Sequence, residues 1–211
     1  MNVTNTWYSF EGELDKTVCN KIIQLGENKW EDSLVDIKKE ITNEERRSGK
    51  ELEYQTDPNI RKCSVAWLGE LSLYDVVFSY ARKANDNSGW KYDIPVVEKM
   101  QLTRYRGGEF YNFHKDGDSD HLSVFKNPKD EILRGYVRKL SMSIILNDDY
   151  EGGEFQFAEY KNEECIITTV PEKSSLGTII VFPSGVEHRV NPVTSGTRYS
   201  LVCWFCGPPF K

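Results

Sequence analysis

The sequence predicts a mainly β protein of the α+β class: a distorted double-stranded β-helix (jelly roll) with N-terminal helices packed on one sheet. Apolar residues recur at helical spacing in two segments, and both lie within residues 1–95. Between residues 97 and 205, short runs rich in β-branched and aromatic residues alternate with turns that contain Gly, Pro, Asn or Asp. About eight strands in two facing sheets would account for this alternation.

The two predicted helices precede most of the strands. The first covers Glu11–Asn28 and the second Leu71–Asn85, and in each the apolar residues fall on one side. Such a helix buries its apolar face against another element, here the outside of a sheet. Residues 1–9 are expected to be extended. Between the helices, Asn43–Ile60 is polar, shows no periodic pattern and is unusually long for a loop in a compact domain.

The remaining predicted elements are strands, most of them bounded by turn residues such as Gly152-Gly153 and Pro183-Ser184-Gly185. In chain order they are Lys62–Leu68, Val97–Tyr105, Phe110–Asp116, Gly135–Leu146, Phe155–Phe157, Glu163–Val170, Thr178–Phe182, Val186–Val190 and Thr197–Phe205. The strands alternate side chains between the interior and the exterior.

Length and charge narrow the class of protein. The 211 residues are expected to form one domain, in which residues 1–95 give helical support and residues 96–207 form the jelly-roll core. A net charge of −6 argues against nucleic acid as the main partner, and no apolar run is long enough to span a membrane. Because the N-terminus lacks a signal-peptide pattern, we expect a cytoplasmic protein, of a bacterium or of the host cell of a virus.

The five cysteines are odd in number and scattered, which is typical of reduced thiols in a cytosol. Cys203 and Cys206 have the spacing of a redox or zinc-binding pair. Residues three apart in a strand, however, point to opposite faces, and the sequence has no second pair to complete a zinc site. We therefore expect neither role.

Three residues have the chemistry of a metal site. His114 and Asp116 lie two residues apart in a predicted strand, so their side chains should share a face. His188 lies in another predicted strand, where a buried imidazole needs a partner. Two histidines and one carboxylate occupy one face of a metal and leave positions open, the ligand set of non-haem iron(II) oxygenases. The sequence therefore predicts an iron(II) site.

A second group of polar residues falls in predicted strands. Arg198 begins the last strand, and a buried Arg also needs a partner. Gln101, Thr103 and Tyr105 share one face of an earlier strand, which is reasonable only if that face lines a wet cavity. If Arg198 stands on the sheet opposite the iron, its guanidinium can hold the far carboxylate of a diacid that chelates the metal. 2-Oxoglutarate is such a diacid.

The order and spacing of these residues resemble the prolyl 4-hydroxylase-like family of iron(II)/2-oxoglutarate-dependent dioxygenases. The pattern is His114-x-Asp116, then His188, then Arg198 ten residues later and Trp204 six residues beyond. The wording His-Arg-Val-x-Pro-Val-Thr-x-Gly-x-Arg is similar to the bacterial and phage branch of this family. The resemblance extends from about Arg61 to Gly207.

The resemblance implies roles for further residues. It places Tyr105 as a hydroxyl donor to the far carboxylate of 2-oxoglutarate, with Ser141 and Trp204 also beside this cosubstrate. It further implies that the loop 43–60 is a lid over a bound peptide, with Ser48, Gly49, Lys50 and Arg61 as its residues at the substrate. Iron(II), 2-oxoglutarate and dioxygen are the implied cofactor and cosubstrates, with ascorbate as an accessory reductant.

The implied activity is hydroxylation of a prolyl residue in a peptide or protein, with succinate and CO2 as coproducts. Cys206 stands where many members of the family have a basic residue, so other substrates stay open. A free amino acid or another small molecule is one alternative. A cupin-like metal-binding protein without turnover is the other. The sequence does not indicate the oligomeric state.

Overall fold

The computed structural model describes residues 5–33, 35–36, 54–55, 57–117, 124–127, 129–162, 164–170 and 175–210. Within these ranges the chain is mostly β-structure with two helices, which confirms the predicted class. In chain order the elements are β1 (Tyr8–Phe10), α1 (Lys16–Leu25), β2 (Glu31–Asp32), β3 (Val35–Asp36), β4 (Tyr54–Gln55), β5 (Arg61–Lys62), β6 (Ser64–Leu68), α3 (Leu71–Asn87), β7 (Val96–Val97), β8 (Met100–Arg106), β9 (Phe110–His114), β10 (Val137–Ile145), β11 (Tyr150–Gly152), β12 (Phe155–Lys161), β13 (Glu164–Thr169), β14 (Ile179–Pro183), β15 (Glu187–Val190) and β16 (Val193–Gly207).

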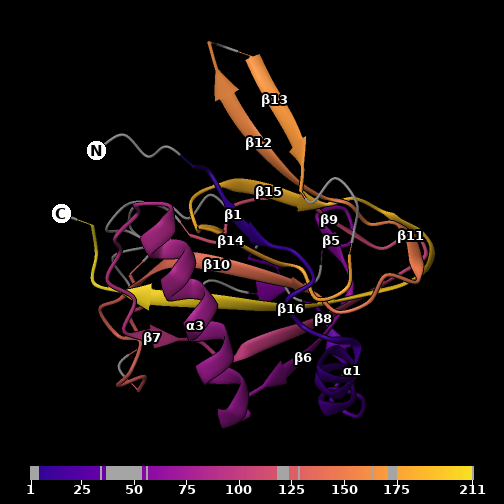
Figure 1. The fold of residues 1–211 in the computed structure, drawn as a ribbon, viewed down its shortest axis with the longest axis horizontal. Helices are drawn as coiled ribbons and strands as arrows, with labels where there is room; N and C mark the ends of the chain where they lie inside the picture. The colour runs from indigo at the N-terminus through magenta and orange to yellow at the C-terminus, as the bar shows by residue number, and fades with distance from the viewer. Residues whose placement is uncertain are drawn as a thin grey trace.

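The strands form two main antiparallel sheets (Figure 1). The larger has nine strands, in the order β1-β14-β10-β16-β8-β6-β2, with β7 and β11 also pairing with β16. The smaller has five strands, in the order β13-β12-β15-β9-β5, and β3 pairs with β4 in a separate ribbon. Strands distant in sequence are therefore neighbours, as the predicted jelly roll requires.

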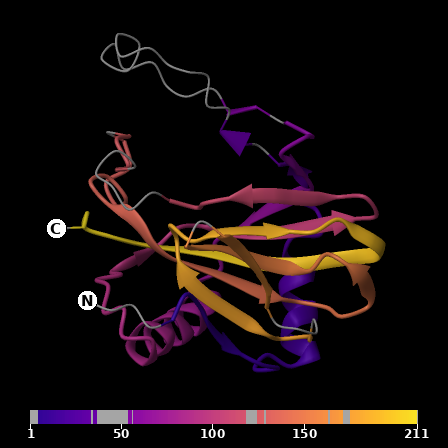
Figure 2. The ribbon, with the colours of Figure 1, turned by 90° about the horizontal axis from the view of Figure 1, so that it is seen from above.

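Both helices cover the same face of the larger sheet (Figure 2). Their buried residues, such as Ile22 and Val77, share one apolar core with Leu102, Met142 and Leu201 of the sheet. These strand residues alternate with side chains that point the other way, toward the smaller sheet. The prediction of helices packed on one sheet is thus confirmed, and the helices leave the other face of the larger sheet free to line the interior.

A second core lies between the two sheets. Phe155 and Phe157 from the smaller sheet pack there with Val65, Ile180 and Phe182 from the larger one. This core is rich in aromatic rings. The ring centroids of Phe157 and Phe182, for example, are 5.1 Å apart, and the two rings meet edge to face. It fills one part of the space between the sheets, beside the polar residues described below.

The first helix is shorter than the predicted Glu11–Asn28, because side-chain and backbone caps fix its ends. It begins after Asp15, whose Oδ1 accepts hydrogen bonds from the N–H groups of Thr17 and Val18 at 2.7 and 2.9 Å. It is followed by Gly26, the C-cap residue. The second helix runs two residues past its predicted end, to Asn87.

A glycine allows the start of α1 to meet the loop before β14. Gly177 has φ +78°, and a Cβ there would lie 1.9 Å from the carbonyl oxygen of Leu14. The Leu14 N–H donates to the Gly177 carbonyl at 3.2 Å. Only glycine combines this backbone conformation with so close an approach.

β16 and β12 differ most from their predicted bounds. β16 begins at Val193 rather than Thr197, because the segment around Gly196 pairs with β11 instead of forming a turn. A Cβ on Gly196 would lie 2.7 Å from the Asp149 carbonyl oxygen, so the glycine permits this pairing. β12 is longer than predicted and forms with β13 a hairpin that projects from the body of the protein (Figure 1).

Candidate active site

The two predicted histidine ligands lie side by side on neighbouring strands. β9 and β15 pair antiparallel, with His114 opposite His188, and the two ring centroids are 4.2 Å apart. Asp116 lies just beyond the end of β9, and its carboxylate reaches both rings: Oδ1 is 3.6 Å from His114 Nε2, and Oδ2 is 3.5 Å from His188 Nε2. The candidate ligand atoms of the three residues all lie within 4.8 Å of one another.

Backbone carbonyls fix the orientation of both imidazoles. The Nδ1 atom of His114 lies 2.8 Å from the Asn112 carbonyl oxygen, and that of His188 lies 2.9 Å from the Val186 carbonyl oxygen. Since a carbonyl only accepts, each Nδ1 carries the proton and donates it. Each Nε2 then directs its lone pair toward the space around Asp116, as a metal-binding histidine does.

Burial and neighbouring charges set the protonation states of His188 and Asp116. Burial and the neighbouring His114 lower the pKa of His188 to about 4, although Asp116 opposes this shift. His188 is packed among Phe155, Phe157 and Phe182, with ring centroids at 5.4, 6.4 and 4.6 Å. For Asp116, burial alone would raise the pKa, but the histidines and Arg138 hold it well below its usual range. Near neutral pH, Asp116 is therefore ionised beside a neutral His188.

These residues fit a divalent metal. Asp116 Oδ2 is buried and accepts no hydrogen bond from any described residue. A buried carboxylate oxygen without a partner is costly, and a cation held jointly with the two Nε2 atoms would satisfy it. Two imidazoles and one carboxylate are donors that suit iron(II), and three protein ligands would leave coordination positions for further ligands.

Arg198 stands on the opposite sheet with unused hydrogen-bond donors. It lies on β16, is only 1% exposed, and donates from Nη1 to Ser200 Oγ at 2.9 Å. Its Nε and Nη2 are buried and have no acceptor among the residues that the structure describes. A buried guanidinium with two free donors needs an anion, because the uncompensated charge is destabilising. A carboxylate would fit both donors in a two-pronged pair.

Tyr105 lies beside Arg198 in the sheet. The two residues are opposite each other on β8 and β16, and the guanidinium carbon is 5.7 Å from the tyrosine ring centroid. Burial raises the pKa of Tyr105 far above its ordinary value, so its hydroxyl stays protonated and can donate. Thr103, on the same face of β8, has a buried hydroxyl without a described partner. Tyr105 and Thr103 thus bring two hydroxyl groups to the same face of the larger sheet as Arg198.

The other predicted cosubstrate residues, Ser141 and Trp204, lie opposite each other on β10 and β16. Ser141 Oγ is 2.9 Å from Ser184 Oγ, and its side chain is fully buried. The indole N–H of Trp204 is buried without an acceptor in the described ranges, while the Arg138 guanidinium stacks 4.2 Å above its ring. Both side chains point toward the smaller sheet.

The structure places Arg61, which the sequence predicts to be part of a cover over the substrate, on β5 with its side chain buried in the wall of the interior. Its role in a cover stays a prediction. Its Nη2 donates to Gln101 Oε1 at 2.6 Å, and its Nε donates to Cys63 Sγ at 3.1 Å. A long cationic side chain between the sheets finds these partners inside. The rest of the predicted cover, Ser48-Gly49-Lys50, lies outside the described residues.

Two residues near the metal site escaped sequence-based prediction. Tyr111 stacks on His114 with ring centroids 3.5 Å apart. The guanidinium carbon of Arg61 lies 4.5 Å from the centroid of the Tyr111 ring. Arg138 contacts the main chain of Asp116. Strict alternation places Tyr111 and His114 on opposite faces, but the register of β9 against β15 shifts between them. Such a bulge brings both side chains to one face and leaves no signal in the periodicity.

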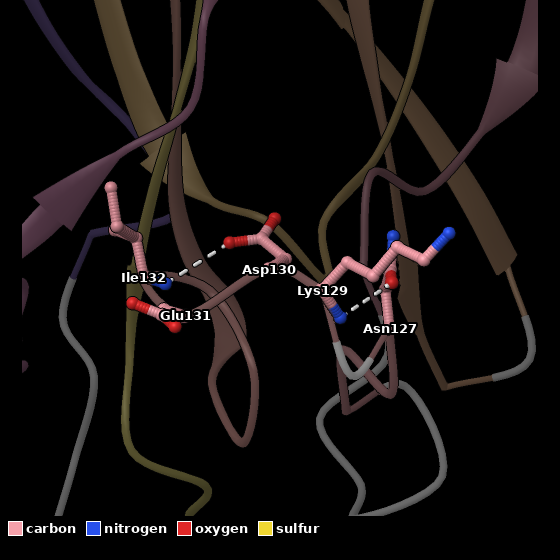
Figure 3. Close-up of a pocket in the computed structure, with 5 residues that line it drawn as sticks. All are labelled: Asn127, Lys129, Asp130, Glu131 and Ile132. Carbon is pink, nitrogen blue, oxygen red and sulfur yellow. Dashed lines mark hydrogen bonds between the residues drawn. The ribbon is translucent and has the colours of Figure 1, made fainter.

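A surface hollow lies elsewhere, in the turns that precede β10 (Figure 3). Its volume is about 500 Å³, and it is lined by Asn127, Lys129, Asp130, Glu131 and Ile132. Backbone N–H groups donate to Asn127 and Asp130 side chains in this segment, which gives the turns their shape. None of the predicted site residues lines the hollow.

Comparison with known proteins points to one family. A family model described as the 2OG-Fe(II) oxygenase superfamily matches residues 100–206, about half of the chain. A PKHD-type hydroxylase of Idiomarina loihiensis is 29% identical over 110 residues, which cover 51% of this chain and 42% of that protein. One of Janthinobacterium sp. (strain Marseille) is 36% identical over 106 residues, 49% of this chain and 41% of that protein. The matched region thus spans less than half the length of these relatives.

Solved structures show the same fold at low sequence identity. A viral collagen prolyl hydroxylase from Paramecium bursaria Chlorella virus-1, in a 2OG complex, has a TM-score of 0.60 at 20% identity, covering 97% of each chain. A Pseudomonas putida prolyl-4-hydroxylase has a TM-score of 0.60 at 19% identity, covering 99% of this chain and 95% of the other. The jelly roll is confirmed by these neighbours. With its two-histidine, one-carboxylate site and the match over residues 100–206, the chain belongs to the 2OG-Fe(II) oxygenase superfamily.

Proposed function

We propose that this protein is an iron(II)- and 2-oxoglutarate-dependent dioxygenase that hydroxylates a prolyl residue in a peptide or protein. The observation that carries the proposal is the pairing of two features across the interior. The His114, Asp116 and His188 side chains converge on one sheet, and Arg198, with two free buried donors, stands on the other. The first feature suits iron(II), and the second suits the far carboxylate of 2-oxoglutarate.

The substrate class is supported by the relatives and neighbours. The curated relatives are named PKHD-type hydroxylases, and the solved neighbours include prolyl hydroxylases. One neighbour, from Trichoplax adhaerens, is a complex with a peptide fragment of the hypoxia inducible factor oxygen degradation domain; it has a TM-score of 0.57 at 18% identity and covers 84% of that chain. A peptide or protein with a prolyl residue is therefore the partner that we propose.

Residues of the two sheets would bind different groups. His114, Asp116 and His188 would hold the metal, and Arg198 with Tyr105 would hold the far carboxylate of the cosubstrate. When bound, iron(II) and 2-oxoglutarate supply the chemistry: dioxygen inserts one oxygen atom into a C–H bond and the other into succinate, with release of CO2. Phe155, Phe157 and Phe182 enclose His188 and exclude water from that side of the site.

The organisation of the chain completes the proposal. We infer one dioxygenase domain, in which residues 1–95 support the catalytic core of residues 96–207. No helix in the described ranges is both long enough and apolar enough to span a membrane. All five cysteines are free, which supports a reducing, cytoplasmic setting, and ascorbate is proposed as the accessory reductant.

The test is a turnover assay that compares matched peptides. The iron-loaded protein is supplied with 2-oxoglutarate, dioxygen and ascorbate, and with peptides that differ only by Pro or Ala at one position. We expect succinate and a gain of one oxygen atom, seen by mass spectrometry, with the Pro peptide only. Oxygen insertion into free proline or another small molecule instead would favour the small-molecule alternative. Metal binding without succinate from any substrate would favour a non-catalytic protein.

Asp116→Ala is the matched control for that assay. It removes one of three metal ligands, so turnover should be abolished. The fold should persist, because Asp116 lies beyond the end of β9 and contributes no side chain to either apolar core. Circular dichroism checks the fold in the same samples. Near-normal turnover in this variant would show that the metal site lies elsewhere.

A further inference from the structure

The main chain of Asp116 is held by groups outside the sheet ladder. β9 ends at His114, so strand pairing does not fix the two residues that follow. The N–H groups of Asp116 and Gly117 both donate to the Ser184 carbonyl, each at 3.0 Å. In addition, the Asp116 carbonyl accepts a hydrogen bond from Arg138 Nη1 at 3.1 Å. One carbonyl and one guanidinium therefore hold the main chain of this candidate ligand.

Arg138 is itself held in a fixed orientation. Its Nε and Nη2 donate to the two carboxylate oxygens of Glu98 at 2.5 and 2.8 Å, a two-pronged pair that sets the plane of the guanidinium. The guanidinium also lies over the Trp204 ring at 4.2 Å. Because Nε and Nη2 are engaged by Glu98, Nη1 is the donor that remains for the Asp116 carbonyl. The planar guanidinium owes this orientation to its two parallel hydrogen bonds with Glu98, which the ammonium group of a lysine cannot reproduce.

Close packing leaves little freedom around this contact. A Cβ on Gly117 would lie 3.2 Å from Arg138 Cβ and 3.6 Å from Ser184 Cβ. The strand that carries Arg138 is irregular here, because its register against β16 shifts between Arg138 and Leu140. The irregularity turns Arg138 to the same side as Ser141, toward the smaller sheet and Asp116.

We propose that Arg138, oriented by Glu98, is a positioning residue that fixes the main chain of Asp116 and thereby aims its carboxylate at the two histidines. This rests on the proposed function, since it assigns a task within the same metal site. The physical reason is that a carboxylate on an unpaired segment has rotational freedom, which must be lost when it binds a metal. By removing that freedom beforehand, the Arg138 contact raises metal affinity.

The test measures cobalt(II) binding, which needs no turnover. Cobalt(II) replaces iron(II), and its visible absorption bands report the geometry of the ligands. Arg138→Met should weaken cobalt affinity about tenfold and alter the bands, as loss of outer contacts to metal ligands commonly does. Arg138→Lys keeps the charge but lacks the fork, so it should restore little of the affinity. Glu98→Gln should shift both readouts in the same direction by less, since one prong of the pair survives.

Arg104 offers a matched control. Its guanidinium also stacks 4.2 Å over a tryptophan, Trp30, and it donates only to Ser64 among the described residues, with no contact to Asp116. Arg104→Met removes a similar arginine–tryptophan stack, so cobalt affinity and the absorption bands should stay unchanged. An equal loss in Arg104→Met, or unchanged affinity and bands in Arg138→Met, would overturn the proposal. Should Arg138→Met not fold, Arg138→Lys and Glu98→Gln decide by the same criteria.

The two proposals fail in different ways. Cobalt binding that depends on Arg138, in a protein that hydroxylates no substrate, would count against the proposed function and leave the role of Arg138 standing. Normal turnover and unchanged cobalt bands in Arg138→Lys and Arg138→Met would do the reverse.

Discussion

At the scale of single residues, two buried arginines differ in the partners that their side chains have. Arg198 has two buried donors without a described acceptor, whereas Arg61 is paired with Gln101 and Cys63 and covers the Tyr111 ring. Both are buried arginines on strands. The difference between them is the state of their donors, and the unpaired donors of Arg198 favour an anion beside that residue.

Replacement of Arg198 should therefore affect the cosubstrate and spare the metal. Charge-assisted hydrogen bonds contribute about 1.5–3 kcal/mol each, so Arg198→Ala should weaken 2-oxoglutarate binding at least tenfold. Arg198→Lys should fall between wild type and Arg198→Ala, because an ammonium keeps the charge and loses the two-pronged fit. Titration of 2-oxoglutarate into the metal-loaded variants measures this. Iron affinity without cosubstrate serves as the control, and unchanged cosubstrate affinity in Arg198→Ala would make Arg198 a structural residue.

Spacing along a strand explains why the convergence of the candidate metal ligands could be predicted. His114 and Asp116 were expected to share a face, and they do lie together, although Asp116 lies past the end of the strand. His188 and Arg198 were recognisable because a charged or titratable residue is rare inside an apolar strand. Arg138 was not recognisable: its strand is irregular after that position, so simple alternation places it on the wrong face.

At the scale of elements, the sequence pattern also limits how well strand boundaries and strand pairing can be predicted. The strands β8, β10 and β14 were predicted with small errors at their ends, since each offers at least five residues for a pattern. Two-residue strands such as β2 and β7 are too short to show any period. The pairing of β9 with β15 joins segments far apart in the chain, and nothing in either segment alone specifies its neighbour. It was the chemistry of the histidines that linked them.

The contact between α1 and the loop before β14 makes a testable prediction. Gly177→Ala forces an L side chain into φ +78° and puts a Cβ against the Leu14 carbonyl oxygen. The backbone must move, so we expect a loss of more than about 1 kcal/mol in the free energy of unfolding. Urea denaturation measures it. Gly69→Ala is the control, because a Cβ there meets no atom within 4 Å and its φ is not positive. Equal stability of the two variants would contradict the close contact.

At the scale of the whole molecule, the positions of the cysteines distinguish the buried interior from the surface. Cys19 and Cys203 lie in the helix–sheet core, and Cys63 lies between the sheets. Cys206 is also buried, with its Sγ 3.5 Å from Glu98 Oε1. Cys165 differs from all of these because it is exposed on the projecting hairpin of β12 and β13.

Alkylation of the native protein should therefore modify Cys165 first and the other thiols only on unfolding. The thiolate is the reactive form, and burial raises the pKa of Cys19 to about 11, which keeps it protonated at pH 8. Mass spectrometry after a brief iodoacetamide treatment should show one modified site, and none in Cys165→Ser. Rapid native labelling of Cys19 or Cys203 would mean that the helix–sheet core opens easily.

The pairing of β9 with β15 also has a consequence for how the protein folds. The two histidines are 74 positions apart (188 − 114) and become neighbours only when these strands have met. The metal site is thus among the contacts of long sequence separation, which form at high entropic cost. A metal that binds only the folded chain adds stability by mass action and ties these two strands together. Iron supply would then set how long the amides of β9 and β15 resist hydrogen exchange, and equal exchange with and without metal would disprove this coupling.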